Sequence, residues 1–255
     1  MASPSLSALV VARDEEANLE SWLASTRFAD ERIVVVDARS RDATLEIARR
    51  GADRVVVREF DNFAAQRNAG LELARGEWIL SLDADERIPA PLAREIQTVL
   101  ADRQNPHVAF RIPIRSEILG RPFTHSGTQD DLPVRLFRAG CGRWTGMVHE
   151  TVAIRGSIGR LENPIDHRTL PDVRSFLRKI EEYTTLEALN LHQAGRRYRT
   201  SELAFRPVWT FLKLYLAKQG FRDGLEGLMF CVLSGVSVAI RVWKLRELGV
   251  AGGGS

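Results

Sequence analysis

Two aspartates separated by one alanine follow a short apolar run in this sequence. Asp83, Ala84 and Asp85 come directly after residues 78–82 (WILSL). Because side chains alternate along an extended chain, the two aspartates point to the same side. Two carboxylates converging at the end of a strand suit a hard divalent cation, Mg²⁺ or Mn²⁺. The same letters also fit a solvated acidic turn, so the surrounding elements decide between the two interpretations.

Two other apolar runs end in acidic residues. The run at residues 32–37 (RIVVVD) ends in Asp37, and the run at residues 6–12 (LSALVVA) is followed by Glu15 and Glu16. An acidic residue at the start of a helix is favoured by the helix dipole, and this explains Glu16 better than Glu15. If the runs are neighbouring strands, these residues form one polar crevice.

Gln66, Arg67 and Asn68 lie near the start of a helical pattern that follows Asn62. Arg67 and Asn68 can contact a phosphate or a ribose. The alternative is an exposed helix face without a ligand.

The first hundred residues alternate strand and helix patterns. Short runs rich in Val and Ile are typical of parallel strands buried on both faces. Strand–helix alternation implies right-handed crossovers and a parallel sheet covered by helices, with ligands at the carboxyl ends of the strands. We therefore expect an α/β fold with strands at 6–12, 32–37, 54–57 and 78–82, and helices at 15–24, 44–50 and 63–75, the second capped by Ser40 or Asp42.

The remainder of the chain changes character twice. Residues 107–165 mix strands and loops, and residues from about 171 onward are helical. In the helical part Asp172 can cap the first helix, and Pro207 can open the second at its first turn. We expect short strands at 107–115 and 133–138, and helices at 172–194, from 207, and at 225–248.

Composition is that of a globular protein, with 44% hydrophobic residues and a net charge of +3. The charge is uneven, because residues 196–248 hold ten basic residues against four acidic ones. Such a basic segment favours an anionic partner. Two cysteines form no disulfide framework, which indicates a reducing compartment, and no signal segment opens the chain.

The blocks ALVVARDEEANLESWL, IVVVDARSRDAT and FAAQRNAGLELARGEWILSLDADE, across residues 6 to 86, resemble the N-terminal half of a family 2 glycosyltransferase with the GT-A fold. The block LPVRLFRAGCGRWTGMVHE (132–150) and the C-terminal tail are similar to a bacterial subgroup that includes lipopolysaccharide-core β-1,4-glucosyltransferases. The resemblance implies a Rossmann-like, mostly parallel sheet flanked by helices, with an amphipathic helical extension.

The resemblance also implies a division of the chain. Residues 1–170 would form the GT-A catalytic domain, with a nucleotide-sugar half at about 1–105 and an acceptor half at about 106–170. Residues 171–248 would be the helical extension, and residues 249–255 a linker-like tail.

Roles follow from the resemblance position by position. Asp37 would recognise the base, which is uracil in most relatives, and Asp83 would meet the ribose or the metal. Asp85 would hold the metal that bridges the two phosphates, with Mn²⁺ and Mg²⁺ both open. The residues expected around the nucleotide sugar are Ala12, Arg13, Glu15, Asp37, Arg67, Asn68, Asp83 and Ala84.

Sugar transfer from a nucleotide diphosphate needs a base for the acceptor hydroxyl but no general acid, because a metal offsets the charge on the leaving group. Glu150 is the first candidate for the base, and Asp131 and Asp130 are the others. His149 is a candidate third metal ligand or phosphate contact. A surface glutamate and a packing histidine are the simpler alternatives for this pair.

The C-terminal tail reads as amphipathic. Its apolar run at residues 228–240 is well short of the roughly 20 residues that a spanning helix needs. Trp209 and neighbouring apolar residues are interleaved with Lys213 and Lys218, so the tail can lie on an anionic membrane. Burial within an oligomer is an equal alternative. No nucleic-acid-binding motif accompanies the basic residues, so we expect no nucleic acid.

Together these features and the resemblance predict an inverting, metal-assisted transferase that moves a sugar from a UDP-sugar to a glycan or lipid-linked acceptor.

 The expected donor is a UDP-hexose, and the expected location is the cytoplasm, peripheral at the inner face of the bacterial cytoplasmic membrane. A nucleotidyltransferase that makes a sugar nucleotide is one alternative, but it usually needs a Gly-rich, basic phosphate loop where this chain has ARDEE after the first strand. A catalytically silent glycan- or membrane-binding module is the other, and the intact carboxylates argue against it.

Overall fold

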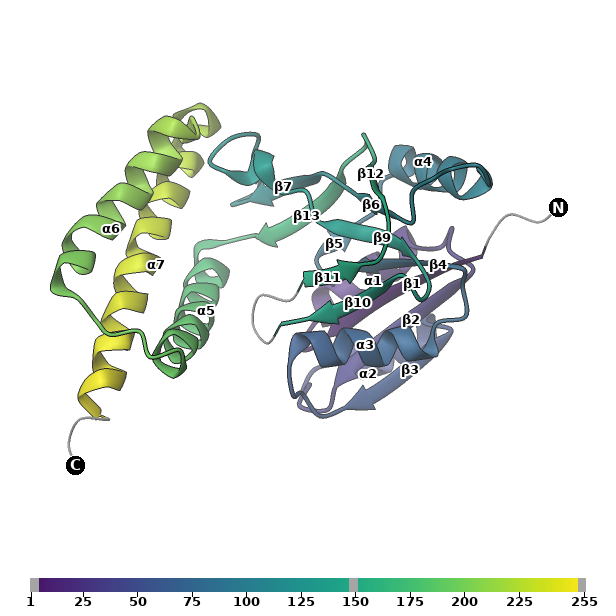
Figure 1. The fold of residues 1–255 in the computed structure, drawn as a ribbon, viewed down its shortest axis with the longest axis horizontal. Coiled ribbons are helices and arrows are strands. Elements are labelled where there is room, and N and C mark those ends of the chain that lie inside the picture. The colour runs from purple at the N-terminus through teal and green to yellow at the C-terminus, as the bar shows by residue number, and fades with distance from the viewer. Residues whose placement is uncertain (1–4, 147–150, 252–255) are drawn as a thin grey trace. The chain divides into compact units, whose positions relative to one another are not determined.

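The computed structural model describes residues 5–146 and 151–251. The chain forms two compact units (Figure 1). The first unit comprises residues 1–114 and 132–167, and the second comprises residues 115–131 and 168–255.

The first unit is built on a seven-stranded sheet with the order β12-β6-β9-β4-β1-β2-β3. Strands β4, β1, β2 and β3 are parallel neighbours, whereas β9 runs antiparallel between β4 and β6. The four strands expected in the first hundred residues are confirmed. The strands are β1 (Leu6–Ala12), β2 (Glu31–Asp37), β3 (Arg54–Arg58), β4 (Trp78–Leu82), β6 (Ala109–Arg111), β9 (Val134–Arg138) and β12 (Ile158–Arg160).

Helices cover both faces of this sheet, which explains why its central strands are apolar without alternation. Leu9, Ile33 and Val35 form one cluster, with Leu71 of α3 packed against it. Their neighbours along the strands, such as Val10, face the opposite side with residues of α1, α2 and α4. The helices are α1 (Glu16–Ser25), α2 (Thr44–Gly51), α3 (Phe63–Leu73) and α4 (Ala90–Ala101).

Two short pairings complete the first unit. β5 (Glu86–Arg87) pairs antiparallel with the start of β13 (Ile165–Leu170), so that His167 lies opposite Glu86. β10 (Gly142–Thr145) pairs antiparallel with β11 (Thr151–Ile154). The first of these pairings brings residue 167 beside the turn that follows β4.

The second unit is mainly helical, as the sequence predicts. Its helices are α5 (Val173–Gln193), α6 (Thr200–Leu212) and α7 (Gly224–Ala251), with a π-helical turn at Lys213–Ala217 and a 3-10 turn at Gly220–Asp223. The expected cap is confirmed, because the Asp172 carboxylate accepts a hydrogen bond of 2.7 Å from the Ser175 backbone N–H. β7 (Ile114–Ile118) starts at the unit boundary and pairs with β8 (Arg121–Pro122).

The prediction that Pro207 opens a helix is wrong. Pro207 lies inside α6, which begins seven residues earlier at Thr200. An interior proline removes one backbone hydrogen bond, so tertiary packing must hold the helix together there. A Cβ on Gly235 of α7 would lie only 2.9 Å from the Pro207 carbonyl oxygen, which shows how closely the two helices approach.

The apolar part of the tail is also longer than expected. Within the described residues, the segment Gly220–Val250 is long and apolar enough to cross a membrane, and its most apolar 18-residue window has a mean hydropathy of 1.7. The run at 228–240 therefore belongs to a helix that continues beyond it in both directions. Length and composition alone do not separate a spanning helix from the core helix of a soluble protein. Only 22% of the most apolar window is buried in this structure.

Candidate active site

The polar residues predicted at the strand ends do meet at one edge of the sheet. β4, β1 and β2 are adjacent and parallel, so their carboxyl ends point the same way. Asp37 is the last residue of β2, Asp83 follows β4, and Arg13 follows β1. The topology therefore gathers these residues in the position where parallel sheets bind ligands.

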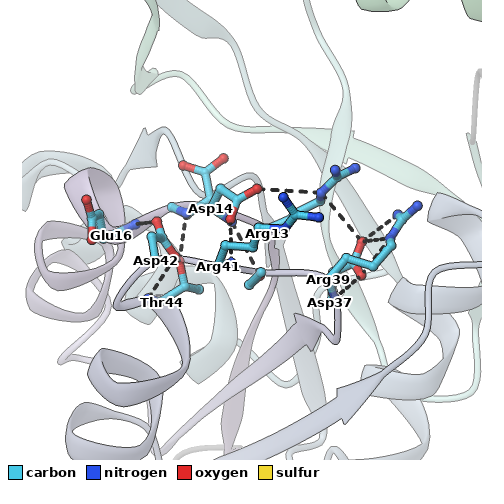
Figure 2. A network of polar contacts seen from close by, with 10 residues as sticks. Arg13, Asp14, Glu16, Asp37, Arg39, Arg41, Asp42 and Thr44 are labelled. Atoms are coloured by element: carbon cyan, nitrogen blue, oxygen red, sulfur yellow. Dashed lines mark hydrogen bonds and ion pairs between the residues drawn. The ribbon is translucent and has the colours of Figure 1, made fainter.

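The loops after β1 and β2 are tied together by hydrogen bonds (Figure 2). Asp14 adopts a left-handed backbone conformation, with φ 52°, which aspartate and asparagine tolerate better than most residues. Its carboxylate accepts a bond of 2.8 Å from the Arg41 backbone N–H. The Glu16 carboxylate accepts from the Ala43 backbone N–H at 3.0 Å, and Asp42 accepts from the Thr44 N–H in the first turn of α2 at 3.0 Å.

Asp37 is enclosed by arginine. Its side chain is only 1% exposed, and Arg39 Nη2 donates to it at 2.6 Å. Arg13 Nε lies 4.0 Å from the same carboxylate. Hydrogen bonds from Arg39 lower the pKa of Asp37, so this carboxylate is charged at neutral pH.

Asp83 belongs to a buried network of charges. Arg67 of α3 donates to one carboxylate oxygen, and Arg135 of β9 donates to the other at 2.5 Å. The same Arg135 nitrogen donates to Glu86 at 2.6 Å, and Glu86 in turn accepts from the Asp83 backbone N–H at 2.9 Å. Two cations thus face two carboxylic side chains behind the end of β4.

Burial and the two arginines act against each other in this network. Burial alone would raise the pKa of Asp83, but Arg135 and Arg67 outweigh it and hold that pKa well below its usual value. Burial raises the pKa of Glu86 well above its usual value, and the neighbouring Asp83 charge adds to this effect. Asp83 therefore carries the negative charge with which the arginines pair.

Arg67 and Asn68 lie where the sequence predicts, at the site edge of α3, but both have protein partners. The Arg67 guanidinium is 4.6 Å from the centre of the Trp144 ring, in addition to its bond with Asp83. Asn68 donates to the Trp144 carbonyl at 2.9 Å and accepts from its N–H at 3.0 Å. Their contact with a phosphate or a ribose stays a prediction.

Asp85 lies beside a histidine that no sequence motif indicates. His167 Nε2 is 3.2 Å from Asp85 Oδ1, and both side chains are less than one-fifth exposed. Burial lowers the pKa of His167, but the Asp85 carboxylate and the nearby acidic residues raise it more. Among the described residues, no group of three or more His, Cys, Asp or Glu side chains is placed to hold a metal ion. Within the described residues, Asp85 and His167 thus form a carboxylate–imidazole pair at the end of β4.

Three residues of this site were missed because their partners come from distant parts of the chain. Arg135 stands inside the apolar strand VRLFR, and a charge within a buried strand needs a partner, so the sequence held a signal. Glu86 directly follows Asp85, and its complete burial is not visible in the sequence. His167 reaches the site only through the pairing of β13 with β5.

The three candidates for the general base differ in where they lie. Asp130 and Asp131 belong to the second unit, where Lys218 Nζ donates to Asp130 at 2.6 Å. Buried Asp223 holds the preceding loop, since it accepts from the His125 N–H at 3.2 Å and from Ser126 Oγ at 2.7 Å. Glu150 and His149 lie outside the described residues, so their roles stay predictions from sequence.

A comparison with known protein families agrees with this sheet and its strand-end site. The family described as "Glycosyl transferase family 2" matches residues 7–146. The chain belongs to this family. A lipopolysaccharide core biosynthesis glycosyltransferase, LpsC of Rhizobium meliloti, is 29% identical over 95% of this chain and 92% of its own length. An uncharacterized glycosyltransferase of Rickettsia typhi is 24% identical over 95% of this chain and 87% of its own length.

Solved structures agree on the fold. The mannosyltransferase PcManGT from Pyrobaculum calidifontis, in complex with GDP-Man and Mn²⁺, has a TM-score of 0.51 at 16% identity and covers 100% of this chain and 77% of its own. The GT-A fold expected from the sequence is confirmed, including the helical C-terminal extension. The chain is thus an enzyme of the glycosyltransferase class.

Proposed function

We propose that this glycosyltransferase moves a hexose from a UDP-sugar to a hydroxyl of a glycan or lipid-linked acceptor, with inversion and with the help of a divalent metal. The observation that carries the proposal is the Asp85–His167 pair at the end of β4, at the same sheet edge as Asp37. The similarity to a lipopolysaccharide core biosynthesis glycosyltransferase supports the acceptor class.

The residues at this edge fit a metal-bound diphosphate. Asp85 and His167 would hold the ion, and an imidazole ligand suits Mn²⁺ better than Mg²⁺, which prefers oxygen. A bound divalent metal offsets the charge that develops on the leaving diphosphate. Asp83, with Arg67 and Arg135 on its two oxygens, would fix the strand end next to the ribose. Glu150 would take the proton from the acceptor hydroxyl, so that a single in-line displacement inverts the sugar.

Removal of either proposed metal ligand should weaken metal binding. We expect Asp85→Ala and His167→Ala each to lower Mn²⁺ affinity by more than about tenfold. Even the loss of a residue that only hydrogen-bonds to a metal ligand costs about that much, and a direct ligand should cost more. Electron paramagnetic resonance in the presence of UDP measures the affinity. Asp53→Ala is a matched control, because Asp53 precedes β3 at the opposite edge of the sheet. Unchanged Mn²⁺ affinity in His167→Ala would remove His167 from the metal site.

The second unit supports a peripheral membrane location, at the inner face of the cytoplasmic membrane. One face of α6 carries apolar side chains at helical spacing, among which Phe205 is 74% and Trp209 is 68% exposed. Val208 and Leu212 are the others on α6, and Leu216 continues the stripe in the π-helical turn that follows. Arg206 and Lys213 stand beside them, and α6 has 13 residues, too few to span a bilayer. An exposed apolar stripe flanked by cations is typical of a helix that lies in the membrane interface.

The membrane proposal predicts sedimentation with vesicles. The full-length protein should bind vesicles of phosphatidylglycerol and phosphatidylcholine at low salt, and should bind less to phosphatidylcholine alone. The double variant Phe205→Ser/Trp209→Ser should lose most of this binding. Leu177→Ser, which replaces an exposed apolar residue of α5, should retain it. If the unaltered protein stays in solution with anionic vesicles, an oligomer contact becomes the better explanation for the apolar helices.

A further inference from the structure

The second unit holds a cavity of about 390 Å³. Its walls come from Ser116 of β7, from the loop at residues 126–131, from the π-helical turn at Lys213–Ala217 and from α7, and these segments all belong to this unit. The volume falls near the lower end of the range of about 300–1,000 Å³ that is typical of small-molecule sites. A compact ligand therefore suits this space.

The loop wall of the cavity is held in a fixed and unusual shape. Ser126 has a left-handed backbone conformation, with φ 60°, which is uncommon for a residue other than glycine, and Gly127 follows it with φ 91°. The Ser126 N–H donates to the Lys218 carbonyl at 3.0 Å, and the Ser126 hydroxyl donates to buried Asp223 at 2.7 Å. A strained residue that its surroundings hold in place is typical of a ligand-binding site.

Another wall of the cavity is apolar. Leu214 comes from the π-helical turn, and such turns occur frequently at functional sites. Phe230 comes from α7, where its ring packs against the rings of Phe123 and Phe176, with centroid distances of 5.5 Å and 5.8 Å. These contacts keep the ring in place, so the cavity offers a ligand a preformed apolar surface.

A buried hydroxyl group lines the same cavity. Ser116 lies on the buried face of β7, between Ile114 and Ile118, and is 5% exposed. Among the residues that the structure describes, its hydroxyl group has no hydrogen-bond partner. A buried hydroxyl group that makes no hydrogen bond costs free energy. Since serine both donates and accepts, a hydroxyl group of a ligand in the cavity would supply the missing bond.

The charges at the cavity favour a neutral ligand. Asp130 is paired with Lys218 at 2.6 Å, and Asp131 adds a further carboxylate. An anion would be repelled by Asp131, a small cation would leave the apolar wall uncovered, and a plain hydrocarbon chain would leave the Ser116 hydroxyl unpaired. A sugar ring has neutral hydroxyl groups for the two polar residues and C–H faces for the apolar wall. The cavity thus combines the surfaces that recognition of a sugar requires.

We propose that this cavity binds a sugar ring of the acceptor glycan. The C–H faces of the ring pack on Leu214 and Phe230, the Ser116 hydroxyl bonds one hydroxyl group of the ring, and the Asp131 carboxylate accepts a hydrogen bond from another. The inference rests on the proposed function, because it names the site at which the acceptor is held. This role uses the hydrogen-bonding capacity of Asp131 and not its basicity, so it agrees with Glu150 as the base.

Steady-state transfer to a lipid-free lipopolysaccharide-core oligosaccharide tests this assignment. Ser116→Leu puts a larger side chain into the cavity and removes the hydroxyl group, so it should raise the KM for the oligosaccharide by at least about tenfold. Ser116→Ala removes the hydroxyl group alone and should raise this KM by about two- to tenfold, the effect of one neutral hydrogen bond. The rate at saturating oligosaccharide and the slow release of UDP in water should both stay within about twofold, because only binding of the acceptor is weakened.

Ser201→Leu is the matched control, because Ser201 is an exposed serine of α6 that does not line the cavity. It should leave the KM for the oligosaccharide unchanged, and thermal unfolding of each variant verifies that it is folded. If the unaltered protein releases UDP from a UDP-hexose but both Ser116 variants keep the KM of this control, the inference is overturned and the proposed function stands. If the unaltered protein releases UDP from no UDP-hexose, the proposed function fails and this inference fails with it.

Discussion

Replacing Glu150 by glutamine should lower the rate of sugar transfer by about two to four powers of ten, which is the usual contribution of a general base. Glutamine keeps the size and hydrogen-bonding capacity of glutamate but cannot take the acceptor proton. Binding of the donor and of Mn²⁺ should survive, because we assign these to residues of the strand-end site such as Asp85. Single-turnover transfer measured with saturating donor shows whether the loss is in chemistry rather than in binding.

The same isosteric change at Asp130 and Asp131 provides the comparison. Asp130→Asn removes a carboxylate whose oxygen already accepts a bond from Lys218, and we expect only a small change in rate. Asp131→Asn should also stay near normal. An inactive Asp131→Asn beside a near-normal Glu150→Gln would move the base to Asp131, and the sequence around His149 would then have a positioning role at most.

The second large effect concerns stability. Arg135→Met should lower the free energy of unfolding by about 3–5 kcal/mol, because it removes the cation from the fully buried Glu86 and leaves Asp83, which is about one-third exposed, with Arg67 alone. For a chain of this size, each kcal/mol corresponds to a shift in Tm of about 2–4 °C, so calorimetry should show a drop of roughly 6–20 °C. Methionine fills similar space, so a lost contact surface contributes little to this change.

Arg138→Met is the control in the same strand. Arg138 stacks on Trp78 at 4.8 Å rather than pairing with a buried carboxylate, so its loss should cost no more than about 1–2 kcal/mol. Adding Glu86→Gln to Arg135→Met should restore part of the lost stability, because it removes one unpaired carboxylate. Equal Tm values for the two arginine variants would contradict the buried network.

The sequence predicts the parallel part of the sheet well because burial on both faces makes its strands continuous apolar runs. β1 (Leu6–Ala12) and β4 (Trp78–Leu82) begin and end where the apolar runs do. The placement of Asp37 and Asp83 at one edge follows from this parallel arrangement. The local apolar pattern and the parallel topology are therefore sufficient to predict these strands and the position of the two aspartates.

Features that depend on distant pairings could not be predicted in the same way. The antiparallel insertion of β9 beside β4 carries Arg135 to Asp83, and nothing in the local spacing specifies that register. His167 reaches Asp85 across 82 residues for the same reason. Pro207 was misplaced because its local preference for a helix start was outweighed by the packing of α6 on α7.

Release of UDP from a UDP-hexose is the most direct measurement of the central claim. The purified protein should release UDP slowly in Mn²⁺ with water as acceptor and faster when a lipopolysaccharide-core glycan is added, and chelation of the metal should stop both. Asp85→Ala should behave like the chelated enzyme. A protein that leaves every nucleotide sugar intact, but joins a nucleoside triphosphate to a sugar phosphate with release of pyrophosphate, would contradict the account and establish a nucleotidyltransferase instead.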